Sequence, residues 1–395
     1  MNAQLKLEIQ EKIEHITAVL LQTLDDIPGA GLYGGRSGVA IYFSYLNKVQ
    51  PDAQYNAIIN QLISDSFESI NEDVSSPSYS FGITGILWTL HHLKTEGLID
   101  ADDYFEELIP FIGEQMIVYA SNSNFDYLHG AVGIGFYLLH FENEITEGYL
   151  YKLIQLLQEK GISEHDTIKW ESNFNAENQK NFNLSLSHGI SSIVIFLSKL
   201  LKRTPAYSNE VSNLLKKSLN YLLSQKNDPG ERLISLFPNA GELKNESQNS
   251  RLSWCYGDLG IATSFWQAGK LLREEKWKEE ALHMMHHASK RRDLKLNQVA
   301  DAGICHGTAG IAHLFNRFYR ETKDQVFKET ADYWIKETLK MARFEDGLAG
   351  YKAWQGENGW MNQHGILEGI AGIGLVLLSH LSNEEPSWDR SFLLS

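Results

Sequence analysis

The sequence predicts an all-α fold, an α/α toroid in which seven outer helices alternate with seven inner helices. Two observations predict it: a short glycine element followed by an apolar run recurs seven times along the 395 residues, and no strand-like block interrupts the repeats. The elements have the form Gly-x-x-Gly and begin at Gly35, Gly82, Gly130, Gly189, Gly257, Gly307 and Gly369. The fourth departs from the pattern, because Ser192 replaces its second glycine.

The segments after and between these elements predict the two kinds of helix. Residues 86–90 and 373–378 are nearly all apolar, which is typical of helices buried on most faces. These would be inner helices. Amphipathic stretches with charged faces predict half-solvated outer helices at residues 55–70, 104–119, 211–223 and 327–341.

The glycines need a packing reason that all repeats share. A glycine costs about 1 kcal/mol in a helix interior, whereas a pair at i and i+3 removes side-chain bulk from one helical face and lets backbones approach closely. Inner helices that taper at the same end would close into a ring, and the residues just before each glycine would project into its cavity. We therefore expect one domain over residues 1–395, although length alone favours two or three.

Composition excludes several classes of partner. The formal net charge of −15 argues against binding to nucleic-acid phosphates and favours a basic or amphipathic substrate. No apolar run has the length of a signal peptide or of a membrane-spanning helix. Two cysteines without an export signal favour reduced thiols, so we expect a cytoplasmic protein without membrane insertion.

Both cysteines of the chain lie two residues before a glycine element, and we interpret them as one metal site. The first is Cys255, the second is Cys305, and His306 follows directly. Three nitrogen or sulfur ligands with an open fourth position are typical of catalytic zinc, whereas structural zinc closes four protein ligands. Two thiolates make a soft centre that suits ionisation of a third thiol. The alternatives are a structural zinc site closed by His364 or Asp258, and cysteines that are merely small buried residues.

Other polar residues share the positions before the glycine elements. The residue before the first glycine is a histidine in three repeats, at His129, His188 and His306. His188 is the candidate general acid, because imidazole titrates near neutral pH. Asp126 stands four residues before its glycine element and Arg251 four residues before the first cysteine; the alternatives are a helix N-cap for Asp126 and a solvated loop charge for Arg251.

Long connections precede the last four elements, and they could form the walls of a substrate groove. They lie at residues 161–187, 226–254, 293–304 and 343–367.

Four of these motifs together resemble the lanthionine synthetase C (LanC-like) family. They are Trp-Cys-Tyr-Gly-Asp-Leu-Gly at 254–260, Cys-His-Gly-Thr-Ala-Gly at 305–310, Ser-His-Gly at 187–189 and Leu-Glu-Gly-Ile-Ala-Gly at 367–372. The resemblance covers essentially the whole chain. It implies a double α-toroid and one zinc ion held at Cys255, Cys305 and His306, with active-site positions at His188, Asp126, Arg251 and Tyr256.

The resemblance also implies an activity, the cyclisation of a dehydrated precursor peptide. A peptide cysteine adds to the β-carbon of dehydroalanine or dehydrobutyrine, and the resulting enolate takes up a proton. We expect His188 to supply that proton, Asp126 to handle the released proton or orient His188, and Arg251 to stabilise the enolate oxygen or the peptide backbone. A lanthipeptide dehydratase and an export transporter are implied as associates.

Three other functions stay open. A relative that adds glutathione or another small thiol to dehydro residues would carry the same ligands, and so would a non-catalytic scaffold with structural zinc. A toroidal glycosidase would use Asp126, Asp258 or Glu368 as paired carboxylates, which leaves the Cys-Cys-His cluster unexplained. The roles of His129, His364 and Glu368 are also open.

Overall fold

The computed structural model describes residues 3–72, 76–100, 104–172, 181–203, 207–228, 233–242 and 249–395. Residue contacts divide the chain into two compact units. The first unit comprises Met1–Ser76, Ser80–Asp103 and Val299–Ser395, and the second comprises Pro77–Tyr79 and Tyr104–Gln298. That the chain acts as one domain stays a prediction.

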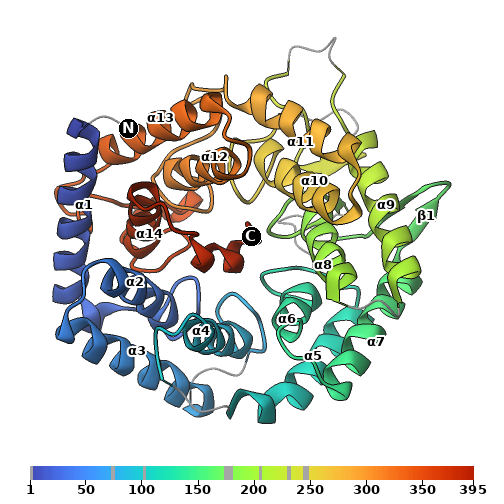
Figure 1. Ribbon diagram of the computed structural model, residues 1–395, viewed down its shortest axis with the longest axis horizontal. Coiled ribbons are helices and arrows are strands. Elements are labelled where there is room, and N and C mark those ends of the chain that lie inside the picture. Colours follow the sequence, from blue (N-terminus) through green and yellow to red (C-terminus); the bar gives the residue numbers. More distant parts are fainter. Residues whose placement is uncertain are drawn as a thin grey trace. The chain divides into compact units, whose positions relative to one another are not determined.

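The described residues form fourteen α-helices in the alternating order that the repeats predict (Figure 1). The helices that follow the glycine elements are α2 (Arg36–Val49), α4 (Ile83–Thr95), α6 (Ala131–Leu138), α8 (Ile190–Arg203), α10 (Asp258–Leu272), α12 (Thr308–Thr322) and α14 (Ile370–Leu381). The helices between them are α1 (Ala3–Gln22), α3 (Ala53–Glu72), α5 (Ile109–Ser121), α7 (Glu144–Lys160), α9 (Ser208–Ser224), α11 (Glu275–Ala288) and α13 (Gln325–Lys340). Short 3₁₀ helices are η1 (Leu24–Asp26), η2 (Tyr104–Leu108), η4 (Gly356–Asn358) and η5 (Ser387–Phe392).

Burial separates the two kinds of helix as predicted. Every residue of α14 from Ile370 to Ser379 is buried, as expected for an inner helix. In contrast, α9 buries one face, on which apolar residues recur at helical spacing, for example Leu215, Leu219 and Leu222. The amphipathic pattern of the sequence therefore corresponds to a half-solvated outer helix.

Each unit is built by packing neighbouring inner helices against one another. In the second unit α6 packs on α8 and α8 packs on α10, with α5, α7, α9 and α11 beside them. In the first unit α12 packs on α14, α14 on α2, and α2 on α4. Figure 1 shows α14 next to α2 although they come from opposite ends of the chain, so the last repeat packs directly on the first.

The glycines allow the close backbone approach that was predicted, and the backbone that they contact belongs to the loop of the same repeat. A Cβ on Gly310 would lie 1.9 Å from the carbonyl oxygen of Ile304, six residues earlier. A Cβ on Gly133 would likewise lie 1.9 Å from the carbonyl oxygen of Tyr127. A side chain at Gly310 or Gly133 would collide with the loop, so these glycines make room for the loop to fold back over its own helix. In the fourth repeat Ser192 occupies the same position and is buried.

This fold-back also caps the inner helices. Their N-cap residues are glycines without a capping side chain, so the first N–H groups need other acceptors. Carbonyl oxygens seven residues earlier supply them: Thr308 donates to Asp301 at 3.1 Å, and Ala309 donates to Ala302 at 3.3 Å. These main-chain hydrogen bonds fix the loop between the accepting carbonyls and the glycine. We call this arrangement the loop–helix frame, and the predicted functional residues lie in its loop.

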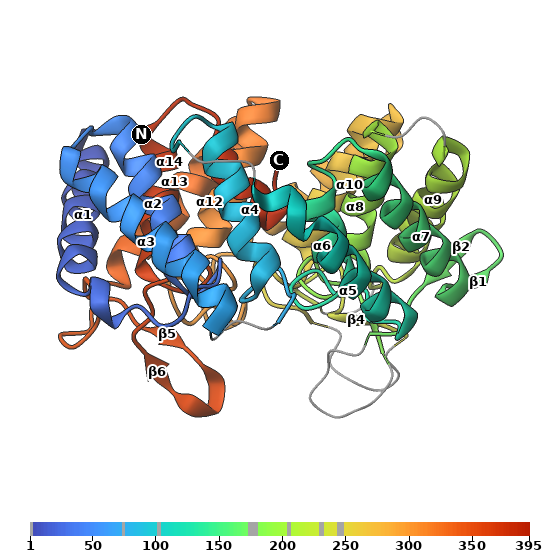
Figure 2. The same ribbon diagram turned by 90° about the horizontal axis from the view of Figure 1, so that it is seen from below.

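The expectation that no strand interrupts the repeats was wrong for three short antiparallel strand pairs. Two or three residues per strand are too few to show a period of two in the sequence. The strands lie in the long connections, whose residues 173–180, 229–232 and 243–248 are outside the described residues. The pairs are β1 (Ile162–Glu164) with β2 (Thr167–Lys169), β3 (Phe182–Asn183) with β4 (Ala240–Gly241), and β5 (Ala353–Trp354) with β6 (Trp360–Met361). Figure 2 shows the β5–β6 hairpin projecting away from the helices of its unit.

Candidate metal centre and active site

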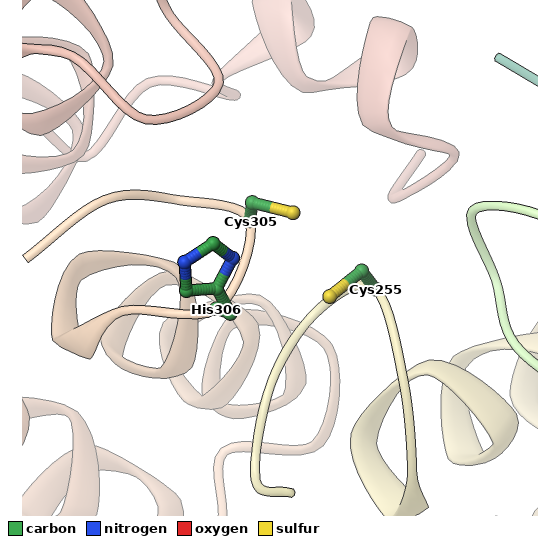
Figure 3. Close-up of side chains that lie close together, drawn as sticks. All are labelled: Cys255, Cys305 and His306. Atoms are coloured by element: carbon green, nitrogen blue, oxygen red, sulfur yellow. The ribbon is translucent and has the colours of Figure 1, made fainter. Parts of the chain in front are cut away.

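The two cysteines and His306 form a group that could hold a metal ion. Cys255 lies in the loop before α10, while Cys305 and His306 lie in the loop before α12, and the two cysteines are not joined in a disulfide. One ligand atom from each residue lies within 4.8 Å of the other two (Figure 3). Ligand atoms around a tetrahedral zinc are roughly 3.5–4 Å apart, given bonds of about 2.0–2.3 Å. This donor set therefore fits zinc in its chemistry, and its atoms lie within 4.8 Å of one another.

The imidazole of His306 lies between two carboxylates of its own unit. Its Nε2 is 3.3 Å from Oδ2 of Asp301, and its Nδ1 is 3.8 Å from Oε1 of Glu368. Burial alone would raise the pKa of the Asp301 carboxyl, but His306 and the backbone N–H groups of Trp354 and Gly303 outweigh burial and lower that pKa below its ordinary value. Asp301 therefore faces His306 as a carboxylate. Sequence reasoning missed Asp301, whose only signal is its position five residues before a histidine.

The loop that carries Cys255 is bonded to the loop that carries His188. The carbonyl oxygen of Cys255 accepts the N–H of Leu186 at 3.0 Å. On its own loop, the Oγ of Ser253 lies 3.4 Å from the Cys255 sulfur. Consecutive repeats therefore place the predicted general acid and a predicted metal ligand on adjoining loops.

His188 and Asp126 form a buried pair within the second unit. Nδ1 of His188 is 2.7 Å from Oδ2 of Asp126, and the two side chains are 9% and 7% exposed. Oδ1 of Asp126 accepts the backbone N–H of His129 at 2.7 Å. The alternative of Asp126 as a helix N-cap is wrong, because Gly130 caps α6. The carboxylate instead contacts the imidazole of His188, and its role in orienting that ring stays a prediction.

Tyr256 and His129 complete the aromatic surroundings of His188. The ring of Tyr256 is 6.3 Å from that of His188, and its hydroxyl accepts the amide N–H of Asn183 at 3.1 Å. The ring of His129 stacks on His188 at 5.8 Å. Burial lowers the pKa of His129, and the charge of His188 adds to this while Asp126 opposes it. Asn183 was not identified from the sequence, because it is brought here by a two-residue strand.

The remaining predicted residues fall into different surroundings. Asp258 is fully buried and pairs with Arg291 at 2.7 Å. It also accepts the backbone N–H groups of Leu236 and Phe237, so this carboxylate holds that segment to α10 and does not close a metal site. His364 lies 3.1 Å from the hydroxyl of Thr23. Arg251 is half-buried, and its interaction with an enolate or a peptide stays a prediction.

A family model for lanthionine synthetase C-like proteins matches residues 27–393. This chain belongs to that family. The LanC-like chain is 24% identical over 412 residues to the nisin biosynthesis protein NisC of Lactococcus lactis subsp. lactis, covering 98% of this chain and 82% of that protein. It is also 23% identical over 327 residues to glutathione S-transferase LANCL1 of Danio rerio, covering 80% of this chain and 76% of the relative.

Among solved structures, this LanC-like chain is similar to nisin cyclase. The TM-score is 0.73 at 18% sequence identity, covering 98% of this chain and 97% of the other. A likeness at this identity shows the fold, and it confirms the predicted class of an all-α toroid of helix pairs. Within the described part of the chain, no helix is both long enough and apolar enough to span a bilayer.

Proposed function

We propose that this LanC-like protein is a zinc-dependent lanthipeptide cyclase. In the reaction, a peptide cysteine loses its thiol proton and its sulfur bonds to the β-carbon of dehydroalanine or dehydrobutyrine. The carbon–carbon double bond becomes an enolate, which takes a proton at the α-carbon to give a thioether ring. The observation that carries the proposal is the grouping of two cysteine sulfurs and one histidine nitrogen within 4.8 Å of one another.

The donor set suits thiol chemistry. Zinc held by Cys255, Cys305 and His306 would supply a soft Lewis acid that lowers the pKa of an incoming thiol. Sites that activate water more often use histidines and carboxylates. This contrast supports a sulfur nucleophile over hydrolysis, and it leaves the glycosidase reading without support from the cysteines.

Side chains of this protein would deliver the proton that the enolate takes up. Nδ1 of His188 faces Asp126 at 2.7 Å, so the carboxylate would accept a hydrogen bond from Nδ1 and hold the ring in place. Proton delivery to the enolate α-carbon would then occur from Nε2. Arg251 would stabilise the enolate oxygen, and Tyr256 would bind the peptide next to His188, held by its contact with Asn183.

A second candidate function follows from the likeness to glutathione S-transferase LANCL1. In that case a small thiol such as glutathione would add to a dehydro residue, with the same ligands and the same proton donor. The two functions differ in where the nucleophilic sulfur comes from. A dehydratase and an export transporter are proposed associates only for the cyclase.

The test of the proposed function is His188→Ala, assayed with a dehydrated, cysteine-containing peptide. We expect zinc content to equal that of wild type and ring formation to fall about 10²–10⁴-fold, the usual contribution of a positioned general acid. Ring formation is followed by loss of alkylatable thiol at unchanged peptide mass. The matched control is His380→Ala, because the buried imidazole of His380 also pairs with a carboxylate, that of Asp332, at 2.8 Å.

The outcomes separate the alternatives. Unchanged ring formation in His188→Ala would remove His188 from the mechanism, and loss of zinc would give it a structural role instead. If wild-type protein leaves the peptide thiol free but adds glutathione to the dehydro residue, the second candidate function is correct.

A further inference from the structure

We propose that Asp301 is a positioning residue that sets the tautomer of His306 and thereby presents Nδ1, and not Nε2, to the metal. The inference rests on the metal site of the proposed function, and it concerns only residues of the first unit. Asp301 belongs to none of the motifs that carry the family resemblance.

Asp301 is held rigidly on both of its side-chain oxygens. Its Oδ1 accepts the backbone N–H of Gly303 at 3.1 Å, and its Oδ2 accepts the backbone N–H of Trp354 in β5 at 2.9 Å. The side chain is 1% exposed. Its backbone carbonyl also accepts the N–H of Thr308, the first residue of α12. A carboxylate fixed in this way by main-chain donors can orient the ring that it faces.

The tautomer follows from the acceptor character of the carboxylate. Oδ2 of Asp301 lies 3.3 Å from Nε2 of His306, and an ionised carboxylate can only accept a hydrogen bond. The neutral ring therefore carries its proton on Nε2 and keeps its lone pair on Nδ1. In Figure 3 the ring nitrogen next to the carbon that bears Cβ, which is Nδ1, lies on the side of the Cys305 sulfur, and the other nitrogen points away.

Glu368 competes for the same ring but is the weaker partner. Its Oε1 lies 3.8 Å from Nδ1 of His306, and its side chain is 24% exposed, against 3.3 Å and 1% for Asp301. Its other oxygen accepts the side-chain amide of Gln355. Since charge interactions weaken with distance and with exposure to water, Asp301 determines the tautomer.

An asparagine at position 301 cannot satisfy this arrangement. Three N–H groups, from His306, Trp354 and Gly303, are directed at two acceptor oxygens. The amide of asparagine has one acceptor oxygen and a donor NH₂ group, so at least one N–H would face another donor. The His306 ring would rotate or move its proton to Nδ1, and either change hinders metal binding, because a ligating nitrogen must be unprotonated.

The experiment compares zinc affinity of wild type and Asp301→Asn by competition with a chromophoric chelator. We expect Asp301→Asn to bind zinc about 10–100-fold more weakly, the usual loss when the carboxylate partner of a metal-binding histidine is changed. The matched control is Asp332→Asn, which alters a similar carboxylate–histidine pair, between α13 and α14, and should leave zinc affinity unchanged. An Asp301→Asn protein with wild-type zinc affinity would overturn the proposal.

A second measurement reads the tautomer directly and needs no variant that must fold. Long-range nitrogen–proton NMR of zinc-loaded wild-type protein with ¹⁵N-labelled histidine should show His306 protonated on Nε2. A proton on Nδ1 would overturn the proposal. Neither measurement uses peptide, so a protein that binds zinc as expected yet forms no thioether would refute the proposed function and leave this inference standing.

Discussion

Buried histidines in this protein are distinguished by where their loops place them, and pairing with a carboxylate is not enough to mark a functional one. His188 pairs with Asp126, His380 with Asp332 and His313 with Asp389, each within 2.8 Å. The last pair is almost fully buried behind η5, where it stabilises the packing of the chain end. What sets His188 apart is its place directly before a glycine element, on the loop bonded to Cys255.

His92 differs from these three histidines, because the hydrogen-bond partner of its Nε2 is a tyrosine hydroxyl and not a carboxylate. Its ring stacks on Trp88 at 4.6 Å, and its Nε2 lies 3.0 Å from the hydroxyl of Tyr45. Burial lowers the pKa of His92 to about 3, with a smaller contribution from the charge of Arg390. Since the unfolded chain has an ordinary histidine pKa near 6.5, protonation favours unfolding.

We expect this histidine to contribute acid sensitivity. The free energy of unfolding that neutral His92 contributes is complete above about pH 6.5 and is lost as pH falls towards 3, by about 1.4 kcal/mol per pH unit. In His92→Gln, the free energy of unfolding should therefore fall less steeply between pH 6 and pH 4 than in wild type. Urea unfolding at a series of pH values measures this, and parallel pH dependences in the two proteins would contradict it.

The recurring element of the fold is a loop that turns back over the first turn of its own inner helix. Main-chain carbonyls of the loop cap the helix, and the two glycines make room for them. Because the frame is main chain, the side chains just before the glycine vary freely, from Tyr256 to His306 to Glu368. The same local structure can therefore present a metal ligand in one repeat and a proton donor in another.

Gly310→Ala tests the loop–helix frame. The new Cβ would lie 1.9 Å from the carbonyl oxygen of Ile304, so the loop that carries Cys305 must shift. We expect the free energy of unfolding to fall by about 1–3 kcal/mol, the usual cost of overpacking, and zinc binding to weaken as well. Thermal unfolding and a zinc titration check the two effects.

The control is Gly148→Ala in α7. No atom lies within 4 Å of a Cβ at that position, so the alanine should stabilise the protein by up to about 1 kcal/mol through its higher helix propensity. If both variants changed stability in the same direction, the glycines of the repeats would not be explained by the contact with the loop.

For the molecule as a whole, we expect helix packing to hold the fold together even when no metal is bound. In the first unit the last repeat packs on the first, through α14 and α2. Large side chains such as Trp88, Trp254, Trp334 and Trp388 are fully buried. A core of this kind differs from that of small zinc domains, which unfold without metal.

We therefore expect a chelator to abolish ring formation while the helices remain. Far-ultraviolet circular dichroism should be unchanged after removal of the metal, and activity should return when zinc is added back. Loss of bound metal should lower the free energy of unfolding only by the binding term, about 4 kcal/mol when zinc is at a thousand times its dissociation constant. Unfolding on chelation at room temperature would instead identify a structural zinc scaffold.

The sequence by itself determined the helix pairs, their order, and the group formed by Cys255, Cys305 and His306. This was possible because the glycine elements begin the inner helices at one sequence offset, so residues at that offset lie in the loop before the helix in each repeat. The backbone differs in detail, since Gly257 has a φ of 85°. Tertiary structure decided which partners those residues meet. The backbone N–H of Trp354, in the β5–β6 hairpin, holds the Asp301 carboxylate next to His306. Asp258 instead pairs with Arg291. Such contacts depend on how loops of unequal length fold over one another. Residue type and spacing along the sequence therefore do not predict them.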